Sequence, residues 1–424
     1  MILRVVGALC AALLAVHAPP AAAQPSAARS GAGLTLLHAL QSAVASNPRL
    51  TSAERAIAMA DGRRVQAGAL PNPTLGVEVD NFGSGQNGVV GGAEFTLQVS
   101  QLFELGGKRD ARVQAALGDY DAARWEREAT KLELLSETAI AFVEAMSSQR
   151  RIQILDRQVG ALEKLVPLMQ RRVEAGASSP AEVSRMQAAV GMARLDRERA
   201  RLALAVARRE LATLMGSDAP NFGSVVGNFG LIARPAPLES AIRAIDDNPQ
   251  LMRWTAVRAQ RDASLLSARL KPLPDITAGL ALRHYAETNE NAVRLGVSIP
   301  INVLDRNTGA IREAQELARR TEAERAMNRL TLVATVAKAH DAATAALAQV
   351  DLLRRLILPA ARSALQKVEE GYGQGRFTLL EILDAYRTVF DAELLEHETL
   401  ASFHTAVATI EGLTGSPLHL ARTR

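Results

Sequence analysis

The sequence contains very little cysteine, few aromatic residues and no long apolar run. Its one cysteine, Cys10, excludes a disulfide scaffold. Aromatic residues make up only 4% of the 424 residues. No continuous apolar run reaches about 18 residues, the length that suggests a membrane-spanning helix. The composition therefore excludes a disulfide-stapled domain and argues against a polytopic helical membrane protein.

The residues that are abundant indicate long, closely packed helices. Hydrophobic residues make up 48% of the chain, which is too much apolar surface for an intrinsically disordered protein. Ala, Leu, Arg and Glu are frequent, a composition typical of helices that pack through small side chains. Lys and Arg exceed Asp and Glu by 49 − 45 = 4 charges, and both signs are spread along the chain. This pattern indicates solvated helix faces and gives no support to nucleic-acid binding.

Residues 1–23 have the features of a secretory signal peptide. Arg4 supplies a positive charge, Val5 to Val16 form a short apolar run, and Ala21-Ala22-Ala23 fits a cleavage site before Gln24. Cys10 lies inside this segment and would be removed with it. An exported chain without a spanning helix is either a soluble periplasmic or secreted protein or an outer-membrane β-barrel protein.

The rest of the chain consists of two tandem copies of one unit of about 200 residues. Short matches recur in the same order at offsets of 199 to 201. The matched segments are Asn47–Leu50 with Asn248–Leu251, Pro71–Pro73 with Pro272–Pro274, Gly176 with Gly375, Ser179–Glu182 with Thr378–Glu381, and Leu214–Gly216 with Leu413–Gly415. A single match would mean little, but an ordered series indicates duplication.

Each copy begins with a helix of about 20 residues, at 50–69 and 251–270, that ends at a Pro-x-Pro sequence. Two segments of alternating apolar and polar residues follow, and a period of two predicts strands with one wet face. We expect strands at about 74–81 and 93–102 in the first copy, and at about 275–284 and 292–301 in the second. Each pair is predicted to form a β-hairpin.

A long helical hairpin follows each β-hairpin. In the first copy the pattern predicts a helix from Lys108 to Glu174, about 100 Å long, a turn at Gly176 and a second helix. The second copy repeats this arrangement around Gly375. Pro167 and Pro359 are expected to kink the first arm of each hairpin. Two capping boxes, Ser179 with Glu182 and Thr378 with Glu381, are predicted to start the returning helices.

These elements predict a mainly helical protomer with a small β part. Its divisions are a signal peptide at 1–23, repeat 1 at 24–216, a linker at 217–237 and repeat 2 at 238–424. Four strands cannot close a barrel, whereas three chains supply twelve, so we expect a homotrimer with a β-barrel above a helical barrel. Side chains on the outer face of this barrel would contact lipid: Leu75, Val77, Val79, Phe95, Leu97, Val99, Leu280, Leu282, Leu295 and Val297. Side chains on the opposite face would line the lumen: Glu78, Glu94, Gln98 and Arg294.

The duplicated hairpins, the glycine-centred tips and the sequences Leu70–Leu75 (LPNPTL) and Gln101–Arg109 (QLFELGGKR) resemble the outer-membrane efflux protein (TolC) family. Within it they are most similar to the branch associated with cobalt–zinc–cadmium resistance. The resemblance implies a passive channel-tunnel in the outer membrane of a Gram-negative bacterium, with its helices in the periplasm. It also implies two partners, a periplasmic adaptor (membrane fusion) protein and an inner-membrane resistance–nodulation–division pump. The implied cargo is divalent heavy-metal cations.

The resemblance assigns the helical tips to contact with the adaptor. The residues at the tips are Gly176, Ala177, Ser178, Gly375, Arg376 and Phe377. The two glycines can also be explained as left-handed caps that end their helices. The two explanations are compatible.

The resemblance also places an entrance gate beside the tips, formed by Glu182, Tyr372, Glu381 and Asp384. Tyr372 would hydrogen-bond across to the acidic partner Glu182, and core packing is the alternative for its ring. Glu381 and Asp384 lie one helical turn apart, so three chains would set a ring of carboxylates that favours cations. Glu381 has the capping box as its alternative role. The basic gating residue of the family is replaced here by Phe377, which leaves Arg376 as a substitute.

No catalytic motif and no cofactor site emerges, and we expect a protein that is not an enzyme. The histidines are scattered, and His397 and His404 lie seven residues apart, which is not a usual ligand spacing. We therefore expect no metal site in the duct. Two alternatives remain: the same fold exporting drugs or secreted proteins, and a soluble periplasmic coiled-coil adaptor or scaffold. A soluble adaptor or scaffold would fractionate without detergent, and that class of protein lacks the four alternating strands.

Overall fold

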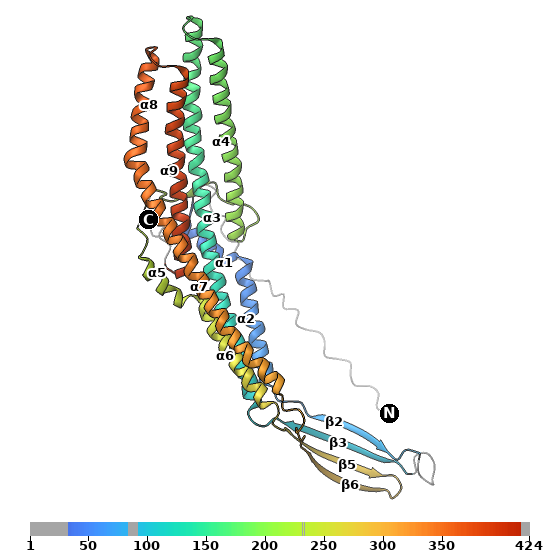
Figure 1. Cartoon of the computed structure of the whole chain (residues 1–424). Helices are drawn as coiled ribbons and strands as arrows, with labels where there is room; N and C mark the ends of the chain where they lie inside the picture. The colour runs from blue at the N-terminus through green and yellow to red at the C-terminus, as the bar shows by residue number, and fades with distance from the viewer. Residues whose placement is uncertain (1–32, 84–91, 231, 233, 417–424) are drawn as a thin grey trace, which may run out of the picture.

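The computed structural model describes residues 33–83, 92–230, 232 and 234–416. The predicted signal peptide and part of the first hairpin loop lie outside these residues. The described chain forms a long helical body with a β-sheet at one end and two helical hairpin tips at the other (Figure 1). The expected fold class, mainly helical with a small sheet and a tandem arrangement of hairpins, is confirmed.

The short helices near the sheet begin in the same way in both repeats. Helix α2 spans Pro48–Ala67 and α6 spans Pro249–Leu270, and each has proline in its first turn. The preceding residues, Asn47 and Asn248, are the N-caps, and their side chains accept hydrogen bonds from the N–H groups of Arg49 and Gln250 at 2.9 and 2.8 Å. The repeated Asn-Pro sequence is therefore a helix start, in which the missing proline N–H costs nothing.

The long helices form the body of the molecule. Their bounds are Lys108–Glu174 for α3, Pro180–Leu214 for α4, Thr308–Leu352 for α7, Leu358–Gly373 for α8 and Leu379–Thr414 for α9. Helix α3 alone has 67 residues and contacts both α4 of its own repeat and α6 and α9 of the other repeat. It is the shared core element of the two repeats.

The two prolines, both expected to kink their helices, differ in the backbone structure around them. Pro167 lies inside α3, whose helical assignment continues past it. Before Pro359, by contrast, a π-helical turn (η2, Leu353–Ile357) separates α7 from α8, and the N–H of Leu358 bonds to the carbonyl of Leu353. Proline lacks an N–H and crowds the carbonyl four residues earlier, and the wider π turn relieves that crowding.

The sheet has four antiparallel strands in the order β2-β3-β5-β6. The strands span Thr74–Asp80, Glu94–Phe103, Ile276–Tyr285 and Glu290–Ser298. The last strand ends at Ser298, three residues short of the expected limit. Its partner β5 starts opposite it at Thr277 in this ladder, so nothing in the described chain pairs with the residues that follow.

The register places all the residues expected to face lipid on one side of the sheet. Leu75, Val99, Leu280 and Leu295 lie side by side across the four strands, followed by Val77, Leu97, Leu282 and Val293. The expected luminal residues project from the opposite face, where Arg283 bonds to Asp80, Glu94 and Thr96. The apolar face is exposed in the single chain. Among the described helices, none combines the length and apolarity needed to cross a membrane.

A small two-stranded sheet, absent from the sequence-based expectation, attaches the linker between the repeats to the helical body. Strand β1 (Leu34–Thr35) pairs in parallel with β4 (Val225–Val226), and α1 (Leu36–Ser46) follows. The side-chain amide of Gln149 accepts from the N–H of Val225 and donates to its carbonyl, both at 3.2 Å. Helix α5 (Leu238–Ala244) follows the linker.

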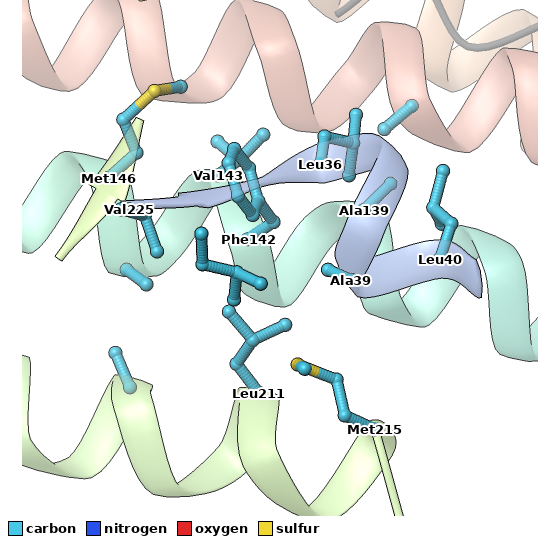
Figure 2. Close-up of a cluster of buried hydrophobic side chains, with 14 residues drawn as sticks. Leu36, Ala39, Leu40, Ala139, Phe142, Val143, Met146, Leu211, Met215 and Val225 are labelled. Atoms are coloured by element: carbon cyan, nitrogen blue, oxygen red, sulfur yellow. The ribbon is translucent and has the colours of Figure 1, made fainter. Parts of the chain in front are cut away.

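An apolar cluster beside the β1–β4 pair holds α1, α3, α4 and β4 together (Figure 2). Phe142 and Val143 of α3 lie between Leu36 of α1 and Leu211 of α4, and all four are almost fully buried. Burying side chains of this size stabilises by about 1.5–3 kcal/mol each. The body of repeat 1 is therefore anchored well away from the tips, which are held by a separate cluster.

Candidate entrance site at the helical tips

The two tips have the same backbone geometry. Gly176 and Gly375 adopt left-handed conformations, with φ of 72° and 74°. At each tip the glycine N–H and the next N–H reach back to carbonyls of the last helical turn: Gly176 to Val173 and Ala177 to Arg172 in repeat 1, Gly375 to Tyr372 and Arg376 to Gly371 in repeat 2. This Schellman pattern requires a left-handed residue, and glycine adopts that conformation most easily.

The side chains at the two tips differ in exposure. Gly176, Ala177, Gly375 and Arg376 are exposed, Ser178 is half-buried, and Phe377 packs inward against Gly371. A β-carbon built at Gly371 would lie only 2.5 Å from the Phe377 ring. The glycine therefore makes room for the aromatic ring, which covers the end of α8.

Below the tips, one apolar cluster joins both repeats. Leu165, Met169 and Met186 come from the first hairpin, and Tyr372, Leu379 and Ile382 come from the second. Tyr372 is only 2% exposed. Burial, opposed by nearby Arg172 and assisted by Glu182, raises the pKa of its hydroxyl. The core-packing explanation for this ring is therefore correct.

The expected hydrogen bond from Tyr372 to Glu182 is absent, which corrects the assignment of that pair. The Tyr372 hydroxyl donates to Sδ of Met169 on α3. The reason is the position of the hydroxyl inside the apolar cluster, where the thioether is the acceptor within reach. Glu182 is half-buried in the first turn of α4.

Arg172, which the sequence did not single out, makes the polar connection between the tips. Its Nη1 donates to the main-chain carbonyl of Tyr372 at 3.0 Å, and its Nε donates to Oγ of Ser178 at 3.3 Å. Its guanidinium carbon lies 4.9 Å from the centre of the Tyr372 ring. Its position as a basic residue in the last turn of a helix could have indicated a role at the helix end. Its partner on the other repeat could not be predicted from the sequence.

The two returning helices start differently. Thr378 and Glu381 form the predicted capping box: the Glu381 carboxylate accepts from the Thr378 N–H at 2.7 Å, and the Thr378 hydroxyl accepts from the Glu381 N–H. The predicted box at Ser179 is wrong, because Ser179 Oγ accepts from the N–H of Ala181. Backbone hydrogen bonding from Thr378, together with its hydroxyl, lowers the pKa of Glu381.

Asp384 lies one turn after Glu381 on α9 and is exposed. Its carboxylate forms no ion pair within the part of the chain that the structure describes. Glu381 and Asp384 therefore present two solvated carboxylates near the tip of repeat 2. At the position equivalent to Asp384, repeat 1 has exposed Arg185.

Further from the tips, a charged cluster joins α3, α8 and α9. The Glu393 side chain is 8% exposed, and it accepts from Arg157 of α3 and Arg362 of α8, both at 2.8 Å. One turn later, His397 lies against Ser147 at 3.0 Å and stacks on Phe229 of the linker. The sequence offered no signal for the contacts of Arg157 with Glu393 and of Ser147 with His397, because these partners lie 236 and 250 residues apart.

His397 and His404 both contact Phe229 of the linker between the repeats. His404 Nε2 contacts the carbonyl oxygen of Phe229 at 2.9 Å, so both histidines hold the same residue. Burial and the charge of Arg151 lower the pKa of His397 to about 4, which leaves it neutral near pH 7. Across the residues described, no group of three or more His, Cys, Asp or Glu side chains is arranged to hold a metal ion.

The two repeats and their order correspond to a known protein family. The sequence profile of the outer membrane efflux proteins matches residues 39–217 and 242–416, one match for each repeat. This chain belongs to that family. The cobalt-zinc-cadmium resistance protein CzcC of Cupriavidus metallidurans is 29% identical to it over 389 residues, which cover 91% of each chain.

A second metal-resistance protein and a solved channel structure are also similar to this outer membrane efflux protein. The nickel-cobalt-cadmium resistance protein NccC of Alcaligenes xylosoxydans is 24% identical over 64% of this chain and 62% of the relative. The crystal structure of CusC, a protein described as forming a transmembrane channel, superposes with a TM-score of 0.77 at 18% identity. It covers 90% of this chain and 92% of CusC, so the folds are the same.

Proposed function

We propose that this outer membrane efflux protein is the channel component of a tripartite system that expels divalent heavy-metal cations. It would work as a homotrimer in the outer membrane and conduct passively, without catalysing a reaction. A periplasmic adaptor would contact its tips, and an inner-membrane resistance–nodulation–division pump would supply the cargo. The metal assignment is supported by the names of CzcC and NccC, which are cobalt-zinc-cadmium and nickel-cobalt-cadmium resistance proteins.

The observation that carries the proposal is the sheet. It has one continuous apolar face that is exposed, and within the described chain strands β2 and β6 each have one edge without a partner strand. An exposed apolar sheet with two open edges is unstable in water. Three copies joined edge to edge supply twelve strands and remove every edge, and lipid then covers the apolar face.

The segment after β6 supports closure by a second copy. Ile299, Ile301 and Val303 continue the alternation of β6 and are 51%, 82% and 63% exposed. The corresponding end of β3 is longer and pairs with β5 as far as Phe103 and Ile276. We infer that residues 299–301 extend β6 along the free edge of β2 in the neighbouring copy.

Cysteine cross-linking tests this closure, because the predicted mature chain contains no cysteine. Ile301→Cys would be combined in turn with Leu75→Cys, Val77→Cys and Val79→Cys, and each pair oxidised in detergent. We expect at least one pair to give covalent dimers and trimers on denaturing gels. Ile301→Cys combined with Met59→Cys, an exposed residue of α2, is the matched control. Monomeric bands for all three pairs would contradict edge-to-edge closure.

The cargo is tested in the cell. Deleting the gene should sensitise the bacterium to zinc, cobalt or cadmium salts, and a plasmid copy should restore tolerance. Sensitivity to drugs with unchanged metal tolerance would contradict the metal assignment while keeping the channel. Recovery of the protein in the soluble periplasmic fraction without detergent would favour a soluble scaffold instead.

The tips are our candidate for the adaptor contact and the entrance. The candidate contact residues are Gly176, Ala177, Ser178, Gly375, Arg376 and Phe377. Exposed Ala177 and Arg376 are accessible to a partner, whereas Phe377 would act by supporting the turn. The candidate gate residues are Glu182, Tyr372, Glu381 and Asp384, and the two carboxylates on α9 favour cations at the aperture.

A further inference from the structure

The geometry points to Arg172 as the residue that links the two tips and keeps the entrance closed, and we call its contact with the Tyr372 carbonyl the latch. This inference rests on the proposed channel function. Arg172 belongs to repeat 1, and its acceptor, the Tyr372 carbonyl, belongs to repeat 2, exactly 200 positions later in the chain. Moving the tips apart would break this contact. The residue is therefore placed to resist separation of the hairpins.

Two helix ends stabilise the charge of Arg172. It lies in the last turn of α3, and its Nη1 reaches a carbonyl in the last turn of α8. The C-terminal end of a helix carries a partial negative charge from its aligned peptide dipoles. A cation placed at two such ends is favoured by both, and leaving one of them has a cost.

Three features make the contact specific for a guanidinium. Its Nε is held by Ser178 Oγ, its Nη1 donates to the carbonyl, and its plane lies near the ring of Tyr372. Arginine can make these contacts together because its donors diverge from a flat group that stacks on aromatic rings. Lysine would keep the charge but not this combination of contacts.

Among the described side chains around Arg172, none provides a second charged link between the tips. The Tyr372 hydroxyl is used by Met169 inside the apolar cluster, and Phe377 packs on Gly371. Neither of these residues supplies a charged contact across the tips. Arg171, its neighbour, is exposed and its Nε reaches only Pro167 of its own helix, so it provides a matched control.

The first test measures separation of the tips directly. Met169 is fully buried in the shared cluster, so a Met169→Cys variant reports opening through its reaction rate with a maleimide. Adding Arg172→Met should raise this rate about tenfold, because one charge-assisted hydrogen bond and one cation–π contact are lost. Arg172→Lys should give an intermediate rate. Arg171→Met, which keeps the contacts of Arg172, should leave the rate unchanged.

The second test measures conductance of the purified full-length protein in planar bilayers. Arg172→Met should increase the open probability or the conductance, and Arg171→Met should not. Size-exclusion chromatography in detergent establishes that each variant keeps the assembly of the parent. A labelling rate for Arg172→Met equal to that of Arg171→Met would contradict the proposal that Arg172 holds the tips together. A parent protein that labels as expected but never conducts would instead refute the channel function.

Discussion

The side-chain amide of Asn248 donates to the main-chain carbonyl of Leu413 at 2.7 Å, joining the start of α6 to the end of α9. The same contact occurs in repeat 1, from Asn47 to Leu214 at 2.8 Å. Both asparagines are almost fully buried. The repeated Asn-Pro sequence therefore has two roles, because the same side chain caps one helix and binds the end of another.

Replacing Asn248 separates these two roles. Asn248→Ala removes the cap and the buried hydrogen bond, and should lower the free energy of unfolding by about 2 kcal/mol. Asn248→Ser keeps a capping oxygen but is too short to reach Leu413, so we expect a loss of about 1 kcal/mol. Denaturant unfolding followed by circular dichroism measures both. Equal losses in the two variants would mean that the cap contributes nothing, and an unchanged stability of Asn248→Ser would mean that the link to Leu413 contributes nothing.

A second junction connects the helices to the sheet and responds to pH. Lys108 Nζ donates to both carboxylate oxygens of Asp275 at 2.9 Å and to the Leu273 carbonyl at 2.6 Å. Burial alone would raise the pKa of Asp275, but hydrogen bonds from Lys108 and the Leu105 N–H outweigh it and lower that pKa. A lowered pKa means that the carboxylate stabilises the fold above its unfolded pKa of about 3.9. This contribution is lost as the pH falls through the lower, folded value.

We therefore expect Asp275→Asn to flatten the loss of stability below about pH 4. Lys108→Met should cost about 1–3 kcal/mol at pH 7, because it leaves the half-buried carboxylate without its main donor. The double variant should lose less than the sum of the two, which thermal unfolding at several pH values can measure. Additive losses would show that the two side chains do not interact.

The limits of the sequence follow from which contacts are local. Alternation and the duplicated pattern predicted the strands and the face that each residue occupies, because both depend on neighbours along the chain. The capping box at Thr378 was predictable for the same reason. The contacts of Arg172 with Tyr372 and of Arg157 with Glu393 were missed because these partners lie 200 and 236 residues apart. The Tyr372 partner was wrongly predicted because burial favoured Met169 over a carboxylate.

The carboxylates near the tip of repeat 2 should control ion preference. Asp384→Asn should reduce the preference for cations, measured as the reversal potential of bilayer channels under a salt gradient. Asp391→Asn is the control, because Asp391 pairs with Arg387 and lies about 10 Å further along α9. Wild-type reversal potentials in the Asp384→Asn channel would exclude it from the aperture.

Glu381 should act in the same way, and its low pKa adds a pH signature. Glu381→Gln keeps the capping geometry, so stability should change little while cation preference falls. Since hydrogen bonds from Thr378 lower its pKa, Glu381 keeps its charge at pH values where an ordinary glutamate, with a pKa of about 4.3, is protonated. Cation preference in the Asp384→Asn channel should therefore persist below pH 4.3 and disappear when Glu381→Gln is added.

Two glycines of α8 predict opposite effects of the same substitution. A β-carbon at Gly371 would lie 2.5 and 2.6 Å from two ring atoms of Phe377, whereas one at Gly373 would meet nothing within 4 Å. Gly371→Ala should therefore cost about 1–3 kcal/mol by displacing the ring. Gly373→Ala should be neutral or stabilise by up to about 1 kcal/mol, because alanine favours the helix.

The ring can be removed to check that it is the cause. Phe377→Ala alone should destabilise the tip through lost packing, and Gly371→Ala should then add little further cost, because the overlap no longer exists. The measurement is the free energy of unfolding of the four variants, taken as a double-mutant cycle. A coupling energy near zero would mean that Phe377 does not depend on the space at Gly371, and that the small residue there serves the backbone alone.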